Sequence, residues 1–173
     1  MDQRSRQLRA VLDGFVASDV REYHCVTVVK RYLAWLDAPF DATSDPTHVT
    51  ASAIVVTDAC SVVVHRHKRL GIYLQPGGHV DGDESPEQAA GRELHEETGL
   101  VLNAERLVHV DVHEGPRGHV HLDLRYLFRL HAMPVFRPAE DESNDVRLVS
   151  HEWIIMHGET SLRRAVEAAL RQL

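Results

Sequence analysis

The stretch Gly77–Leu100, GGHVDGDESPEQAAGRELHEETGL, holds the signals for a glycine-containing loop followed by a helix. Ser85 is a preferred N-cap residue, and Pro86 fits the first helical position, where a missing N–H costs nothing. Gln88 stands three residues after Ser85, which is the spacing of a capping box. Gly99 then supplies a stop signal. The pattern predicts a helix that begins at Pro86 and ends just before Gly99.

Three carboxylates are predicted on one face of this helix. Glu93, Glu96 and Glu97 stand at positions i, i+3 and i+4, which lie within about one turn. Each like-charged pair at this spacing costs roughly 0.2–0.5 kcal/mol, and the negative helix C-terminus adds to the repulsion. Arg92 alone cannot neutralise the cluster, whereas hard cations such as Mg²⁺ and Mn²⁺ prefer carboxylate oxygens. The cluster therefore predicts a divalent cation, in preference to a solvated charged face.

Gly77 and Gly78 allow the backbone to approach a ligand or a metal without an intervening side chain. A plain turn explains the two glycines equally well, so the spacing decides. Gly78 is followed by five residues, then Glu84, then seven residues, then Arg92-Glu93-Leu94-His95-Glu96-Glu97-Thr98-Gly99-Leu100. This spacing matches G-x5-E-x7-R-E-U-x-E-E-x-G-U, where U is aliphatic, at every fixed position. The chain thus resembles the Nudix hydrolase superfamily.

The resemblance implies an α/β (α+β) fold in which a mixed sheet is sandwiched between helices. It also implies metal-dependent hydrolysis of the diphosphate bond in a nucleoside diphosphate linked to another moiety, with Mg²⁺ or Mn²⁺ as cofactor. By this analogy the metal ligands are Glu93, Glu96 and Glu97, with help from the carbonyl of Gly77 or Gly78. The number of metal ions stays open.

Two further roles follow from the resemblance. Arg92 and Glu84 are expected to form a pair that orients the helix against the loop. The general base is expected to be either Glu93, within the box, or Glu142, in the acidic loop Glu140-Asp141-Glu142. The alternative for Glu142 is an ordinary solvated loop residue.

Histidine is abundant, with 13 residues, and His119-Val120-His121 places two rings on one side of a predicted strand. Substrate contact is one expectation for these two residues, jointly with His113 and Arg117. A transition-metal site and a purely structural role are the alternatives, because two histidines do not by themselves make a metal site.

The remaining sequence predicts helices around this box and strands on either side of it. Two amphipathic helices precede a polar connector at residues 40–46, so we expect an N-terminal helical extension over residues 1–39 and a Nudix domain over 47–173. Glu22 is placed as the capping-box partner of Asp19. Strand-like runs are Val49–Val56, Ser61–His65, Ile72–Leu74, Arg106–His113, His119–Leu130 and Val146–Ile155, and a closing helix is Ser161–Leu173.

Composition limits the partners. The 19 basic and 26 acidic residues give a net charge of −7, without the basic stripe that a nucleic-acid duplex would require. No apolar run is long enough to span a membrane, and the first nine residues lack a signal core, so we expect a cytoplasmic protein. Cys25 and Cys60 fall in predicted helix and strand and are expected to be reduced packing residues.

Two other function classes stay open. One is a catalytically inactive Nudix-fold sensor of a nucleotide metabolite, and the other is an enzyme similar to isopentenyl-diphosphate isomerase, with Cys60 as its candidate cysteine. The intact box favours the hydrolase over both. The box does not select among nucleoside diphosphate derivatives, because base and sugar are read elsewhere. Many relatives dimerise, so a homodimer is a further expectation, with the N-terminal helices as either an interface or a lid.

Overall fold

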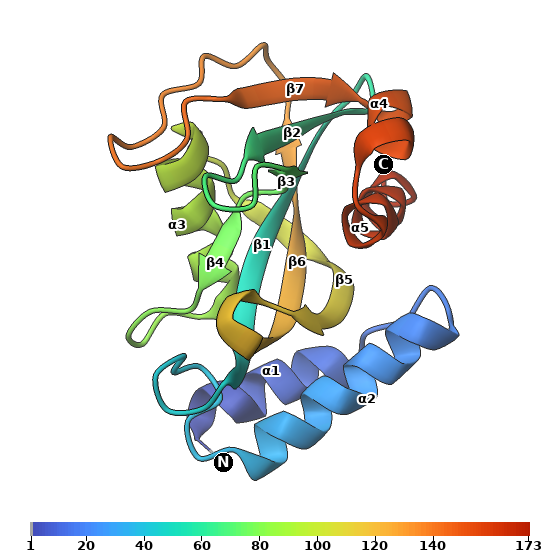
Figure 1. Cartoon of the computed structure of the whole chain (residues 1–173). Coiled ribbons are helices and arrows are strands. Elements are labelled where there is room, and N and C mark those ends of the chain that lie inside the picture. The colour runs from blue at the N-terminus through green and yellow to red at the C-terminus, as the bar shows by residue number, and fades with distance from the viewer. Residues whose placement is uncertain (1) are drawn as a thin grey trace.

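The computed structural model describes residues 2–173, in which a mixed β-sheet lies between helices on its two faces (Figure 1). The helix α3 covers one face, α4 and α5 cover the other, and α1 and α2 lie across one end. This arrangement confirms the α/β fold class. The helices are α1 (Gln3–Asp13), α2 (Val20–Trp35), α3 (Pro86–Thr98), the short 3₁₀ turn η1 (Pro116–Gly118), α4 (His151–His157) and α5 (Thr160–Leu170).

The centre of the sheet is a long parallel pair, β1 and β6, which stay in register from Thr47 opposite Val120 to Thr57 opposite Leu130. The strand order is β3-β2-β1-β6-β5, and in addition β4 pairs with β1 and β7 pairs with β2. All pairings other than that of β1 with β6 are antiparallel. The strands are β1 (Thr47–Thr57), β2 (Ser61–Arg66), β3 (Tyr73–Leu74), β4 (Gly77–His79), β5 (Ala104–Glu114), β6 (Val120–Leu130) and β7 (Val146–Ser150).

The two faces of the sheet differ because successive strand residues point to opposite sides. On one face, β1 contributes Val49, Ala51 and Val55 to a core shared with α1, α2 and α3. On the other face, Ile54 and Val56 pack under α4 and α5. Apolar burial thus fixes helices on both sides of the sheet.

The face under α5 changes character along its length. Towards the start of β1 and β6 it carries polar side chains, which register places side by side on β1, β6 and β5. We call this set the polar floor. Its members are His48, Thr50, Ser52, Asp111, His113, His121, Asp123 and Arg125, and all but His113 and His121 are buried.

The N-terminal hairpin covers the free edge of β5. Glu22, at the start of α2, accepts hydrogen bonds from the backbone N–H of Val110, at 3.1 Å, and from Nδ1 of His109, at 2.5 Å. An edge strand with unpaired backbone groups invites association with other chains, so this cover is protective. Glu22 is not the capping-box partner expected from the sequence, since its other oxygen accepts from the N–H of Ser18 instead of Asp19. The side chain of Asp19 does cap α2.

One strand prediction is wrong in part. The apolar run Val146–Ile155 was expected to be a single strand, but β7 ends at Ser150 and α4 follows. The Ser150 side chain accepts a hydrogen bond from the N–H of Trp153, at 3.2 Å, which makes it an N-cap. The chain therefore turns into a helix where β-propensity alone favours continuation.

The cysteines are free, and only Cys25 is a buried packing residue. Cys60 is exposed in the turn between β1 and β2, with φ of 58°, so its expected strand position is wrong. Over residues 2–173, every helix falls short of the length and apolarity that crossing a bilayer requires.

Candidate active site

The strand β4 brings the backbone of two glycines against the carboxylates of α3. The N–H of Gly77 donates to Glu97 Oε2 at 2.9 Å. A Cβ at Gly78 would lie 2.3 Å from Glu93 Oε1, a distance that no side chain permits. The glycines thus allow Glu93 and Glu97 to approach the strand. The loop expected at these glycines is instead a short strand paired with β1.

Arg92 ties the carboxylates of α3 to the preceding loop. Its guanidinium donates to Glu84 at 2.8 Å, to Glu93 at 2.9 Å and to Glu96 at 3.0 Å. It also donates to the carbonyl of His79 at 2.9 Å. One half-buried cation therefore fixes the orientation of three carboxylates. The capping box of Ser85 and Gln88 forms as the sequence predicted.

Glu93 and Glu97 lack sufficient positive charge nearby. Burial raises the pKa of Glu97 to about 8, a rise that the Gly77 N–H opposes and the charges of Glu93 and Glu142 increase. Burial also raises the pKa of Glu93, against the opposing effect of Arg92. His65 Nε2 lies 3.4 Å from Glu97 Oε2, but burial lowers the pKa of His65 to about 4, so it supplies no charge at neutral pH. The positive charge near Glu93 and Glu97 is therefore smaller than their combined negative charge.

A cleft of about 780 Å³ opens beside this cluster. Glu97, Gly77 and Gly78 line one part of it, and Glu142 lines it from the loop before β7. Two backbone hydrogen bonds hold that loop to the end of α3, from Arg137 N–H to the Thr98 carbonyl and from Ala139 N–H to the Glu96 carbonyl. The four residues expected to contact substrate also line the cleft, and they are His113, Arg117, His119 and His121.

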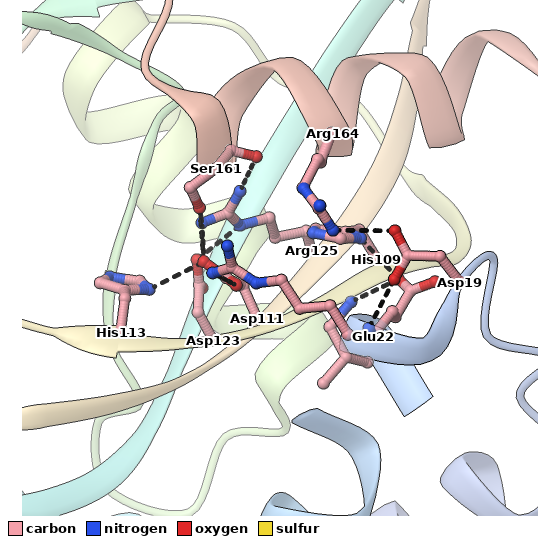
Figure 2. Close-up of polar contacts among 11 residues, drawn as sticks. Asp19, Glu22, His109, Asp111, His113, Asp123, Arg125, Ser161 and Arg164 are labelled. Atoms are coloured by element: carbon pink, nitrogen blue, oxygen red, sulfur yellow. Dashed lines mark hydrogen bonds and ion pairs between the residues drawn. The ribbon is translucent and has the colours of Figure 1, made fainter. Parts of the chain in front are cut away.

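The floor of the cleft is a buried ionic network (Figure 2). Arg125 Nε donates to Asp123 at 2.7 Å, and its terminal nitrogens donate to the carbonyl and Oγ of Ser161 at 2.8 and 2.6 Å. Ser161 Oγ in turn donates to Asp111 at 2.5 Å. Burial favours the neutral acid, but bonds from His113 and Ser161 and the charge of Arg125 hold the pKa of Asp111 well below its usual range. The network is therefore charged.

The same network reaches the N-terminal hairpin (Figure 2). Arg21, on α2, lies 3.0 Å from Asp111, and Asp19 pairs with Arg164 of α5 at 2.8 Å. The hairpin thus contacts both the floor of the cleft and the helix that covers the sheet.

Several residues in the cleft or directly beside it were not anticipated from the sequence. Burial lowers the pKa of His48, His79 and His121, in the last case to about 4, so these imidazoles are neutral at neutral pH. The strands that carry these rings are far apart in sequence, which explains why His48 and His79 were not anticipated, whereas His121 was expected to contact substrate. Residues of the cleft that the sequence analysis missed include Thr50, Ser52, His65, His79, Asp123, Arg125 and Ser161.

Residues 46–170 match the NUDIX domain. The chain belongs to the NUDIX domain family. A MutT-like protein of Streptomyces ambofaciens is 34% identical over 79 residues, which are 45% of this chain and 51% of that protein. The chain thus spans about half the length of this curated relative.

Solved Nudix structures have the same fold. A NUDIX-family hydrolase from Clostridium perfringens is 27% identical, with a TM-score of 0.63 over 73% of this chain and 98% of its own. The NUDIX domain of Shewanella oneidensis NrtR, solved with ADP ribose, is 21% identical, with a TM-score of 0.64 over 82% of this chain and 96% of its own. The enzyme class expected from the sequence, a Nudix-type pyrophosphohydrolase, is confirmed. Cys60, the candidate cysteine of an isomerase, is exposed in the turn between β1 and β2 and is not among the described residues that line the cleft.

Proposed function

We propose that this Nudix domain, residues 47–173, uses Mg²⁺ or Mn²⁺ to hydrolyse a nucleoside diphosphate linked to another moiety. The supporting observation is the carboxylate cluster of α3, where buried Glu97 and half-buried Glu93 face two glycines with too little positive charge nearby. The residues fit a hard divalent cation, because oxygen ligands gather there and their charge is unmet. The ligands are Glu93, Glu96 and Glu97, with the carbonyl of Gly77 or Gly78.

The side chains around the ligands have distinct tasks. Arg92 holds Glu93 and Glu96 at fixed positions, and Glu84 holds Arg92. When bound, the metal neutralises phosphate charge and makes a water molecule more acidic. In the hydrolysis a water molecule would give its proton to a carboxylate base and attack phosphorus, the anhydride P–O bond would break, and the leaving phosphate would take the bonding pair.

We assign the general base to Glu142 in preference to Glu93. Glu142 lines the cleft, whereas Glu93 accepts a charged hydrogen bond from Arg92 at 2.9 Å. A base needs a free lone pair within reach of the water, which favours the carboxylate without a guanidinium partner. Glu142→Gln is expected to lower kcat by about 10²–10⁴. Metal affinity should stay within about threefold of wild type, in contrast to Glu93→Gln.

The substrate class is a nucleoside diphosphate derivative that occupies the cleft. The cleft is also lined by Arg117, His113, His119 and His121, which supply hydrogen-bond donors and one cation for phosphate or sugar. ADP ribose in the NrtR domain is consistent with a ligand of this size and chemistry. The protein is acidic overall, so the bound metal must attract the substrate locally.

The test is release of phosphate-containing products from a panel of nucleotide sugars, dinucleoside polyphosphates and nucleoside triphosphates, with Mg²⁺ or Mn²⁺. Glu97→Gln is compared with wild type. The matched control is Glu87→Gln, because Glu87 is exposed in the first turn of the same helix. Turnover that requires metal, survives in Glu87→Gln and disappears in Glu97→Gln supports the proposal. If no compound on the panel is hydrolysed but one of them still raises the thermal stability of the protein, the hydrolase proposal fails. The catalytically inactive sensor of a nucleotide metabolite then takes its place.

A further inference from the structure

Three histidines from three adjacent strands direct their rings towards one another at the end of the polar floor. His48 of β1 stands opposite His121 of β6, and His79 of β4 stands opposite Thr50, two residues along β1. The ring centroid of His48 lies 5.0 Å from that of His79 and 5.2 Å from that of His121. One nitrogen from each ring lies within 4.8 Å of the others. Strand register thus assembles the cluster.

The central ring has an unused nitrogen. His48 is fully buried, and Nδ1 contacts the carbonyl of Asp45 at 3.3 Å, so this nitrogen carries the proton. Its Nε2 is buried with no hydrogen-bond partner. A buried acceptor without a partner costs roughly 1–3 kcal/mol. Histidines that bind metals typically donate the other N–H to a backbone carbonyl, as His48 does.

We propose that His48, His79 and His121 bind one zinc-class transition-metal ion at a site separate from the carboxylates. Three imidazoles suit Zn²⁺, Co²⁺, Ni²⁺ or Cu²⁺, whereas Mg²⁺ prefers oxygen ligands. A Zn–N bond of about 2.0–2.1 Å requires nitrogens roughly 3.4 Å apart in a tetrahedral site. The three rings must therefore close by about 1 Å. His79 is exposed and can move, while His48 is fixed by its surroundings.

The fourth position of this site faces the cleft. His79, His119 and His121 line the cleft, and the ring of His119 lies 5.1 Å from that of His48. Three protein ligands with an open position are typical of zinc sites that accept water or substrate. The ion would present positive charge to an anionic ligand in the same cleft.

A substitution at Gly115 can disturb the site without removing any of its three histidines. A Cβ at Gly115 would lie 2.4 Å from atoms of the His121 ring, so Gly115→Ala must displace that ring without removing a ligand. His131 offers the control, because its side chain is 68% exposed outside the cleft.

The experiment is calorimetric titration of the full chain with Zn²⁺ in excess Mg²⁺, which occupies the oxygen ligands. Co²⁺ is then used as a probe, because its visible absorption reports nitrogen ligation and geometry. We expect one equivalent of Zn²⁺ per chain in wild type. His79→Ala, His121→Ala and Gly115→Ala should each weaken binding more than about tenfold, since even indirect disturbance of a ligand typically costs 10–100-fold. His131→Ala and Glu97→Gln should bind as wild type.

Retention of Zn²⁺ in Glu97→Gln separates this inference from the proposed hydrolysis, so either can fail alone. Wild-type affinity in both His79→Ala and His121→Ala would overturn the inference. Loss of Zn²⁺ in Glu97→Gln, with retention in the histidine variants, would overturn it too and assign the ion to the carboxylates. His48→Ala is not used, because a buried position risks unfolding.

Discussion

Glu22 Oε1 lies 2.5 Å from Nδ1 of His109, a buried contact that joins helix α2 to strand β5 across 87 positions of sequence. The same oxygen accepts from the N–H of Val110. Burial opposes the charge of Glu22, but bonds from His109 and Ser18 outweigh it and lower the pKa of Glu22 from 4.5 to about 2. This carboxylate therefore links protonation to the docking of the hairpin.

Glu22→Gln is expected to reduce the free energy of unfolding at pH 7 by about 2–3 kcal/mol. A depressed carboxylate pKa stabilises the fold fully above about pH 4.5, and the contribution disappears as the pH falls through about 2. The difference in free energy of unfolding between variant and wild type, measured by urea unfolding, should therefore become smaller as the pH is lowered from 7 to 3. Glu167→Gln, at an exposed position of α5, is the control. An equal gap at both pH values would contradict this account.

Glu97→Gln is expected to separate stability from metal binding. Without metal, the variant should be at least as stable as wild type, because it replaces a buried carboxylate that lacks a cation. Mg²⁺ at a hundred times its Kd should stabilise wild type by about 2.7 kcal/mol and the variant by less than about 1 kcal/mol. Thermal unfolding with and without Mg²⁺ measures both. Equal Mg²⁺ stabilisation would exclude Glu97 as a ligand.

Gly78→Ala is expected to lower metal-dependent activity by about 10²-fold, because the new Cβ displaces the Glu93 carboxylate by an ångström or more. The fold should persist, since the obstacle is the end of a flexible side chain. Gly91→Ala is the matched control on α3, where a Cβ meets no atom within 4 Å. It should keep full activity and gain about 0.5–1 kcal/mol of stability. Similar activity loss in both variants would argue against a positional effect at Gly78.

Arg125→Met is expected to destabilise the protein by about 3–5 kcal/mol, because it leaves Asp123 buried without its cation and removes the more deeply buried of the two arginines beside Asp111. Arg129→Met removes an ion pair with Glu105 at the surface of the same strand and should cost less than about 1 kcal/mol. Denaturant unfolding of the two variants at pH 7 gives the comparison. A small effect at Arg125 would mean that water replaces the guanidinium.

Local signals made the box helix predictable. The helix α3 has the bounds that Ser85, Pro86 and Gly99 indicated, because caps and stops act over a few residues. The boundary between β7 and α4 was missed, although Ser150 was present as an N-cap, because the apolar run around Trp153 favours a strand. Where an N-cap and strand propensity favour different structures in the same segment, tertiary packing determines which structure forms.

The polar floor was mostly missed. Thr50 of β1 and Asp123 of β6 are far apart in sequence, and only strand register brings them to one cleft, to which the packing of α5 adds Ser161. The alternating polar residues of β6, from His121 through Asp123 to Arg125, carried a signal that the pair His119 and His121 revealed only in part. Pairings of distant strands are not encoded in spacing along one segment.

The pairing of β1 with β6 has a consequence for how this chain tolerates change. At the level of Ser52 and Arg125 the shared face is charged, and at the next level, Ile54 and Leu127, it is dry. A substitution on the floor alters the cleft and leaves the dry half intact. A single inserted or deleted residue in either strand would instead turn charges into the core and aliphatic groups into the cleft. The lengths of these two strands, more than any one side chain, keep the ligand-binding surface apart from the folding core.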